Sequence, residues 1–220
     1  MGDLAFDLAH LLAGGLVLFS FVMLYQNRVS ALIAVFAAQA IALTLSVAWQ
    51  AYVQDAPHLY VTAAIALVFK AMIIPASLHR IVVRLDMRRA IEPVGGVGVT
   101  MLIGIGLVAL SLAVMIPATE QADRLAREDL AFALSVVLLG LLMMVTRHNA
   151  ISQIVGFMSL ENGLILAAAA ARGMPFVVEI SIAFSVLIAF IVLGVFVLNM
   201  RERFATVDTK ALDRVRREAP

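Results

Sequence analysis

Seven long apolar runs, separated by short polar breaks, constrain this chain more than any other feature. They cover residues 4–24, 29–53, 58–78, 95–117, 130–146, 150–171 and 174–200. A helix needs about 20 apolar residues to cross the hydrocarbon core of a bilayer. The chain is 63% hydrophobic, whereas a soluble domain has about 45–50% apolar residues. The sequence therefore predicts an all-α integral membrane protein with seven transmembrane helices.

The distribution of cations predicts the orientation of these helices. With the N-terminus outside, one side of the membrane collects most of the 16 Lys and Arg residues of the chain. These are Arg28, Arg80, Arg84, Arg88, Arg89, Arg147, Arg201, Arg203, Lys210, Arg214, Arg216 and Arg217. Because cytoplasmic loops are enriched in Lys and Arg, we expect a cytoplasmic C-terminus and a basic tail that contacts lipid headgroups.

Several classes of function are disfavoured by the residues that are scarce or absent. The chain has no cysteine, which excludes thiolate-held iron–sulfur clusters. Its 4 histidines fall in separate turns or span ends rather than in pairs. The glycines of residues 95–106 lack the strand and the ordered spacing of a nucleotide-binding loop, and we expect them to serve close helix packing. We therefore expect no cofactor, no metal, no nucleic-acid partner and no catalysis by this chain alone.

The first and last thirds of the chain resemble each other. A shift of 122 positions (149 minus 27) places Asn27 on Asn149 and Gln39 on Glu161. The shift spans four helices, an even number, so both triplets of helices point the same way. The expected architecture is two parallel three-helix units joined by a linker helix. The corresponding limits are residues 1–90 for the first unit, 91–124 for the linker, 125–203 for the second unit and 204–220 for the tail.

Three polar residues lie near the predicted midplane. At a rise of 1.5 Å per residue, Glu161, Gln39 and Lys70 lie about 15–18 Å from the first residues of their predicted helices. An ionised side chain at the bilayer centre costs at least about 2.5–3.5 kcal/mol, so such residues normally face the bundle interior or line a path. Pro75, five residues after Lys70, is expected to disturb the helix beside that cation. We predict a proton path through these residues.

Four further residues are candidates for this path. Asn149 and Gln153 share an i, i+4 stripe with Glu161, and a neighbouring stripe of Ser152, Gly156, Ser159 and Gly163 lets another helix approach closely. His148 lies in the adjacent turn, from which an imidazole can pass protons toward Asn149 and Gln153, and Glu179 lies nearer the outer surface. Each candidate also has a plainer interpretation: Glu161 as a structural partner, Gln39 as a hydrogen-bond former, and His148 and Glu179 as solvated surface residues.

The segment "VTRHNAISQIVGFMSLENGLILAAA" resembles the K subunit of respiratory complex I and the C subunit of multisubunit Na⁺/H⁺ antiporters, over about residues 145–203. The whole chain looks more like component E of hydrogenase-4, a family of membrane subunits of [NiFe]-hydrogenase and formate hydrogenlyase complexes. Carried over by position, Glu161 matches the central membrane glutamate of these families. The second deep acid has no counterpart, because Glu179 is too shallow. A mixed line of Lys70, Gln39 and Glu161 remains.

The resemblance implies a non-catalytic membrane-arm subunit that takes part in proton translocation driven by electron transfer elsewhere. Its implied partners are antiporter-like subunits, a quinone-site-type membrane subunit and, through them, the hydrogenase module. The lipid bilayer, expected to be that of a bacterial inner (plasma) membrane, is a further partner. Two other classes stay open: a stand-alone secondary transporter, which would also use midplane charges and repeats, and a purely structural membrane scaffold.

Overall fold

The computed structural model describes residues 2–84, 96–120, 124–171 and 187. The predicted seventh span, residues 174–200, and its candidate Glu179 lie outside this part of the chain. Within it, the regular structure is entirely helical. In the described residues, six helices are long and apolar enough to cross a membrane, in agreement with the prediction of a multi-pass, all-α membrane protein.

The helices follow the predicted runs, with shifted ends. They are α1 (Gly2–Tyr25), α2 (Val29–Gln54), α3 (Pro57–Ile65), η1 (Ala66–Ile73), α4 (Ile74–Arg84), α5 (Val97–Ala118), α6 (Arg124–Thr146) and α7 (Ala150–Ala170). The segments α3, η1 and α4 continue one another as a single rod. The largest differences from the predicted helix ends are at the start of α6 and the end of α4. There each helix continues through charged residues beyond its predicted apolar run.

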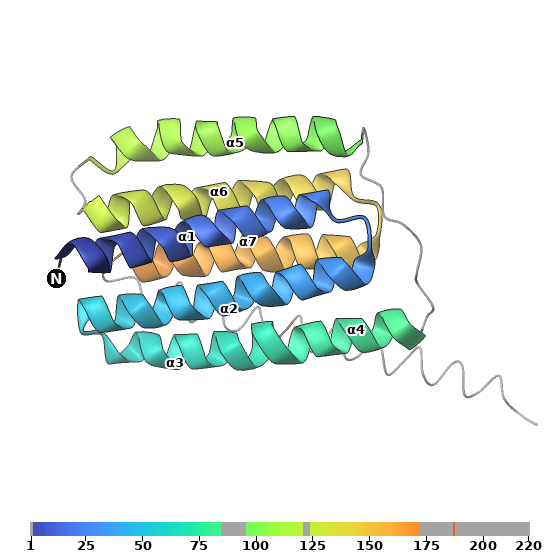
Figure 1. The fold of residues 1–220 in the computed structure, drawn as a ribbon, viewed down its shortest axis with the longest axis horizontal. Helices are drawn as coiled ribbons and strands as arrows, with labels where there is room; N and C mark the ends of the chain where they lie inside the picture. Colours follow the sequence, from blue (N-terminus) through green and yellow to red (C-terminus); the bar gives the residue numbers. More distant parts are fainter. Residues whose placement is uncertain (1, 85–95, 121–123, 172–186, 188–220) are drawn as a thin grey trace, which may run out of the picture.

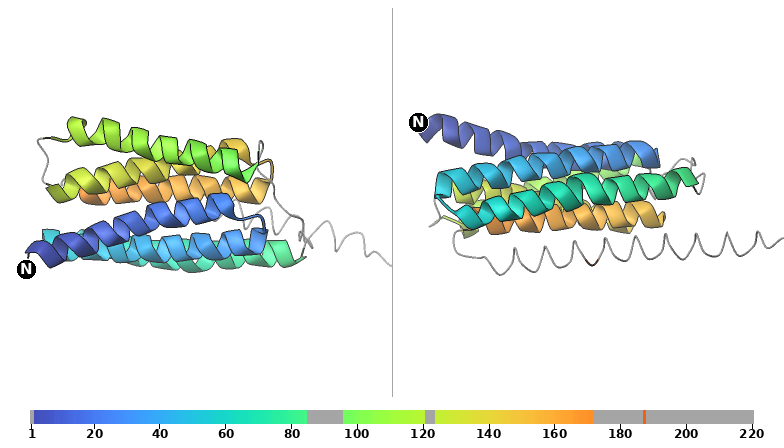
Figure 2. Two further views of the ribbon diagram at one scale, coloured as in Figure 1. Left: turned by 45° about the horizontal axis from the view of Figure 1, so that its top comes forward. Right: turned by 90° about the horizontal axis from the view of Figure 1, so that it is seen from below.

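The helices lie side by side in one bundle (Figure 1). Helices α1, α2, α6 and α7 pack on one another, the rod of α3, η1 and α4 packs on α2, and α5 packs on α6 and α1 (Figure 2). We call the end where α1 and α6 begin the N-terminal end. The opposite end holds the α1–α2 and α6–α7 turns and is called the Arg147 end. The hairpins α1–α2 and α6–α7 therefore run in the same direction.

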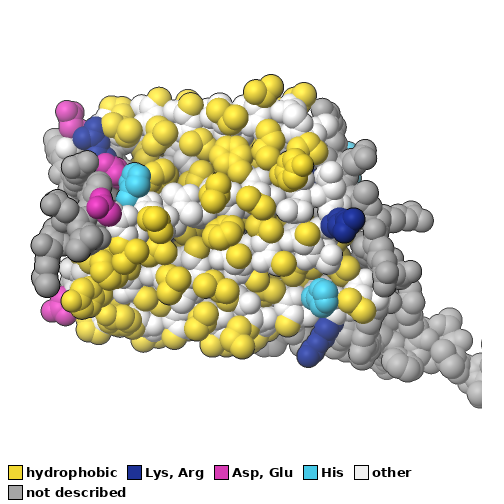
Figure 3. All heavy atoms as spheres, in the orientation of Figure 1, with side chains coloured by type: hydrophobic (Ala, Val, Ile, Leu, Met, Phe, Trp, Pro, Cys, Tyr) yellow, Lys and Arg dark blue, Asp and Glu magenta, His cyan; other side chains and the backbone are white. Residues whose placement is uncertain are grey.

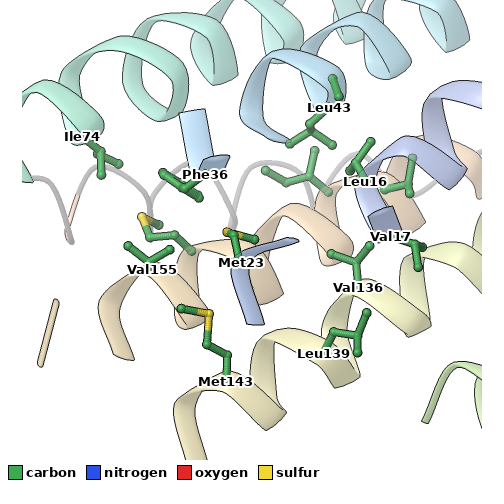
Figure 4. Close-up of a cluster of buried hydrophobic side chains, with 14 of the residues drawn as sticks. Leu16, Val17, Met23, Phe36, Leu43, Ile74, Val136, Leu139, Met143 and Val155 are labelled. Carbon is green, nitrogen blue, oxygen red and sulfur yellow. The ribbon is translucent and has the colours of Figure 1, made fainter. Parts of the chain in front are cut away.

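Apolar side chains fill the bundle and also cover its outside. The interior cluster includes Leu16, Met23, Phe36, Val136 and Val155, which come from four different helices and point toward one another (Figure 4). On the face shown in Figure 3, hydrophobic side chains occupy the middle of the surface and charged ones gather at the two ends. A surface that is apolar in its middle and charged at its ends, as on this face, is suited to a lipid environment.

The tightest packing joins α6 to α7 through glycines. A Cβ atom on Gly140 would lie 2.6 Å from the backbone nitrogen of Leu160, and one on Gly163 would lie 2.8 Å from the carbonyl oxygen of Ala133. At Gly156 the nearest atom would lie at 3.0 Å. The prediction that this stripe admits a close neighbour is confirmed, and α6 is that neighbour. In the glycine-rich start of α5 the outcome is mixed, because Gly104 packs tightly whereas Gly98 and Gly106 have open space around them.

Candidate functional site

A buried ion pair lies in the middle of the bundle. The Nζ atom of Lys70 on η1 lies 3.2 Å from Oε2 of Glu161 on α7. The two side chains are 1% and 4% exposed. Glu161 is about 16 Å along α7 from Ala150 at 1.5 Å per residue, so the pair lies at mid-depth. The structure thus joins the two deep charges that the sequence placed in different predicted units.

Two amides extend the pair into a network. Lys70 Nζ also donates a hydrogen bond to Oδ1 of Asn162, at 2.9 Å. The Nδ2 atom of Asn162 in turn donates to Oε1 of Gln39 on α2, at 3.2 Å. Lys70, Glu161, Asn162 and Gln39 are all buried, and we call these four residues the central cluster. The structure therefore brings Lys70, Gln39 and Glu161 together, with Asn162 connecting Gln39 to Lys70.

Helix α1 fixes the orientation of Gln39. The Nε2 atom of Gln39 donates to Oγ of Ser20, at 2.8 Å, and to the carbonyl oxygen of Leu16, at 3.2 Å. Ser20 donates to the same carbonyl oxygen, at 3.0 Å. With its nitrogen donating to α1, the amide oxygen of Gln39 is left to accept from Asn162. Four segments, α1, α2, η1 and α7, therefore contribute to one buried polar network, which neutralises its charges internally.

The backbone around Lys70 is widened into a π-helix. Residues Ala66–Ile73 form η1, and the N–H of Ile74 donates to the carbonyl oxygen of Phe69, five residues earlier. Pro75 follows immediately. A proline lacks the N–H and its ring crowds the carbonyl of the preceding turn, and a wider turn relieves that crowding. The predicted disturbance beside Lys70 is confirmed, and π-helical turns of this kind are frequent at functional sites.

The other predicted path residues lie away from the central cluster. Asn149 caps α7, its Oδ1 accepting from the N–H groups of Ile151 and Ser152. Gln153 is exposed and donates to the carbonyl oxygen of Arg147, at 2.9 Å. His148 is exposed as well. At 1.5 Å per residue, Asn149 is about 18 Å from Glu161 along the helix, so these three residues belong to the Arg147 end.

Arg147 is buried rather than lying at a lipid headgroup. Its side chain is among the largest that are fully buried, and Nη2 donates to the carbonyl oxygens of Leu24 and Gln26, at 2.6 and 2.9 Å. Burial lowers the pKa of Arg147 from its ordinary value, yet a guanidinium keeps its charge in proteins. The cation caps the C-terminal carbonyls of α1, where positive charge is favourable.

Sequence reasoning missed several members of these networks. Asn162 is a neutral residue beside an ionisable one, and Ser20 resembles the many serines of apolar helices that bond their own backbone, so neither stands out in the sequence. Asp129 lies in a charged stretch before the fifth predicted span, yet it is 1% exposed. The helical spacing of Gln39, Ser46 and Gln50 on one face of α2 is the signal that predicts a polar connection to Asp129.

Comparison with known proteins gives one relationship over the whole chain. No family model and no solved structure matches. The chain is 30% identical over 207 residues to the uncharacterized protein Rv0085 of Mycobacterium tuberculosis, and the alignment covers 93% of this chain and 94% of the relative. Such coverage includes every helix of the central cluster. The chain therefore belongs to the same protein family as Rv0085 of Mycobacterium tuberculosis.

Proposed function

We propose that this protein is a non-catalytic membrane subunit of a complex I-like respiratory or hydrogenase complex, of the hydrogenase-4 or formate hydrogenlyase type. It contributes to proton translocation coupled to electron transfer in other subunits. Its partners are antiporter-like subunits, a quinone-site-type membrane subunit and, through them, the hydrogenase module. The protein functions as a multi-pass subunit of the bacterial inner membrane.

The observation that carries this proposal is the ion pair of Lys70 and Glu161. Burying both charges costs several kcal/mol per ion before their mutual attraction is counted. A scaffold helix has no need for such a pair, whereas a proton path needs groups that gain and lose charge inside the membrane. Asn162 and Gln39 stabilise the pair with hydrogen bonds and have no charge of their own to compete with it.

The sequence resemblance around Glu161 is independent support. The segment of residues 145–203 resembles the K subunit of complex I, and Glu161 falls on the position of its central glutamate. In this chain the partner charge is a lysine from another segment. We infer that a proton arriving at Glu161 releases the Lys70 ammonium from the pair, and that the return of the lysine favours loss of the proton.

The finer architecture is part of the same proposal: seven spans, built as two parallel three-helix units with α5 as the linker. Three observations support it. The hairpins α1–α2 and α6–α7 run in the same direction, and Arg147 of the second turn bonds Leu24 and Gln26 at the first turn. Gln39 and Glu161, equivalent under the 122-residue shift (161 minus 39), contribute to one network.

The orientation with the N-terminus outside and the C-terminus in the cytoplasm follows from the charges. At the Arg147 end lie Arg28 and Arg147, whereas Asp55, Glu128 and Asp129 lie at the N-terminal end. Helix α4 also ends on this side, and the sequence stretch 85–95 that follows it contains Arg88 and Arg89. By the positive-inside rule this side is cytoplasmic.

The test is proton pumping by the assembled complex carrying Glu161→Gln, measured in inverted membrane vesicles. An amide keeps the shape and hydrogen bonds but cannot exchange a proton, so we expect normal subunit content and at least a tenfold loss of pumping, or about 1.4 kcal/mol in the rate-limiting step. Glu161→Asp should retain part of the activity. Leu160→Met, in the same turn, is the matched control and should pump normally.

Two results would count against the proposal. Full pumping by Glu161→Gln at normal assembly would favour the structural scaffold, since Gln39 shows that an amide is accommodated at the equivalent depth. Purification in mild detergent supplies the other test, because a complex subunit co-purifies with antiporter-like and hydrogenase subunits. A chain that runs alone or as a homo-oligomer, and moves a solute in liposomes, would be a stand-alone transporter.

A further inference from the structure

A second buried carboxyl group lies at the N-terminal end of the bundle. Asp129, in the second turn of α6, is 1% exposed. Its Oδ2 accepts a hydrogen bond from Nε2 of Gln50 on α2. Gln50 is itself held by Gln54, whose Nε2 donates both to Oε1 of Gln50 and to the carbonyl oxygen of Ala169 on α7, each at 2.8 Å. Asp129 is thus enclosed by α2, α6 and the end of α7.

The charge of Asp129 is not balanced as that of Glu161 is. Among the residues that the structure describes, no Lys or Arg lies within ion-pair distance of Asp129, and its Oδ1 atom is buried without a hydrogen-bond partner. A buried carboxylate with neither a cation nor a full set of donors is strongly disfavoured, and a carboxyl in such a place takes up a proton instead. Protonation also converts an oxygen into a donor.

A pair of side chains from α1 and α6 lies beside this site. Nδ1 of His10 on α1 lies 2.7 Å from Oε2 of Glu128, and their side chains are 48% and 29% exposed. Glu128 directly precedes Asp129 on α6, so the pair places the partly exposed His10 and Glu128 next to the buried acid. This is the side on which Asp129 is nearest to the surface of the bundle.

A polar stripe on α2 leads from Asp129 toward the central cluster. Gln50, Ser46 and Gln39 are all buried. Ser46 and Gln50 follow Gln39 by seven and eleven residues. These separations are nearly whole numbers of turns at 3.6 residues per turn, so the three side chains share one face of α2. That face spans about 16 Å from Gln50 to Gln39 at 1.5 Å per residue. Gln39 then bonds Asn162, which bonds Lys70.

We propose that Asp129 is a proton-binding carboxyl that exchanges protons between the N-terminal end of the bundle and the α2 stripe leading to the central cluster. When the proton binds, one O–H bond forms on a carboxylate oxygen. When the proton leaves, that bond breaks and the carboxylate is restored. The inference deepens the proposed function and rests on it for the use made of the proton. The protonation itself is a property of this chain alone.

Infrared difference spectroscopy of the full chain in lipid nanodiscs tests the proposal. Spectra are recorded over a pH series for the wild type, Asp129→Asn, and the matched control Asp55→Asn, an exposed acid at the same end of the bundle. We expect a protonated-carboxyl band at neutral pH that is lost in Asp129→Asn and kept in Asp55→Asn. Gln50→Leu retains the acid but removes the donor to Oδ2, so it should shift this band even if Asp129→Asn folds poorly.

Two outcomes would overturn the inference. One is a set of spectra in which neither Asp129→Asn nor Gln50→Leu changes any carboxyl band, which means that Asp129 stays ionised. The other is loss of the band when potassium chloride is replaced by sodium chloride at constant pH, which means that the site binds a metal cation instead. Normal pumping by Glu161→Gln with the Asp129 band present would reject the proposed function alone, so the two failures are distinguishable.

Discussion

The ammonium group of Lys70 contacts both Glu161 and its neighbour Asn162, at 3.2 and 2.9 Å. Two adjacent residues of α7 therefore hold one cation by different chemistry: a carboxylate that balances its charge and a neutral amide that accepts its hydrogen bond. Asn162 also donates to Gln39, so the same residue links the cation of η1 to α2.

Removing one member of the ion pair should destabilise the protein more than removing both. Lys70→Met leaves the Glu161 carboxylate buried without its cation, at a cost of about 3–5 kcal/mol. In the double variant Lys70→Met/Glu161→Gln no charge remains, and much of the stability should return. Thermal unfolding in detergent for the two single variants and the double variant measures this coupling. Additive effects would show that the pair contributes no interaction energy.

The orientation of Gln39 should depend on its donors. Gln39→Glu removes the N–H donor to Ser20 and to the carbonyl oxygen of Leu16. It also places a second carboxylate near Lys70. Gln39→Leu removes the bond to Asn162 instead. We expect each to reduce proton pumping about tenfold, or about 1.4 kcal/mol in barrier height. Ile41→Leu, an exposed position on the same helix, should pump as the wild type does.

Gly140 should not tolerate a methyl group. The Cβ of Gly140→Ala would lie 2.6 Å from the nitrogen of Leu160, so α6 and α7 must separate, at about 1–3 kcal/mol. Gly106→Ala is the matched control, because nothing lies within 4 Å of its Cβ position and alanine has the higher helix propensity. Melting temperatures in detergent should fall for Gly140→Ala only. Equal melting temperatures would contradict the close packing.

Arg147 should be needed for stability rather than for membrane topology. Arg147→Gln removes the guanidinium that satisfies the carbonyl oxygens of Leu24 and Gln26, and an unsatisfied buried group costs about 1–3 kcal/mol. Arg28→Gln removes an exposed cation from the neighbouring turn and should leave the melting temperature unchanged. If both variants melt alike, the contact between the two turns adds no stability.

A cytoplasm-specific reporter fused after Pro220 should be active. The predicted odd number of spans and the cations of the Arg147 end place the C-terminus in the cytoplasm. The same reporter inserted after Asp55, at the opposite end of the bundle, should be silent. If a well-expressed C-terminal fusion is silent, the proposed orientation or the proposed number of spans is wrong.

The long apolar runs determined the helices and their membrane setting, because a bilayer accepts only segments that satisfy their own backbone hydrogen bonds. Depth along each helix also singled out Lys70, Gln39 and Glu161, because position within a span follows directly from residue count. The small-residue stripe on α7 predicted a close neighbour, since the lack of side chains is itself a sequence property.

Only the tertiary structure decided which of these residues meet. Lys70 and Glu161 are far apart in the chain, and their contact depends on how the η1 rod and α7 both pack against α2. The same packing removed Asn149, Gln153 and His148 from the central cluster, buried Arg147 between two turns and enclosed Asp129. A linear pattern gives the depth and the face of a side chain, but helix packing sets the rotation of each helix and the identity of its neighbour.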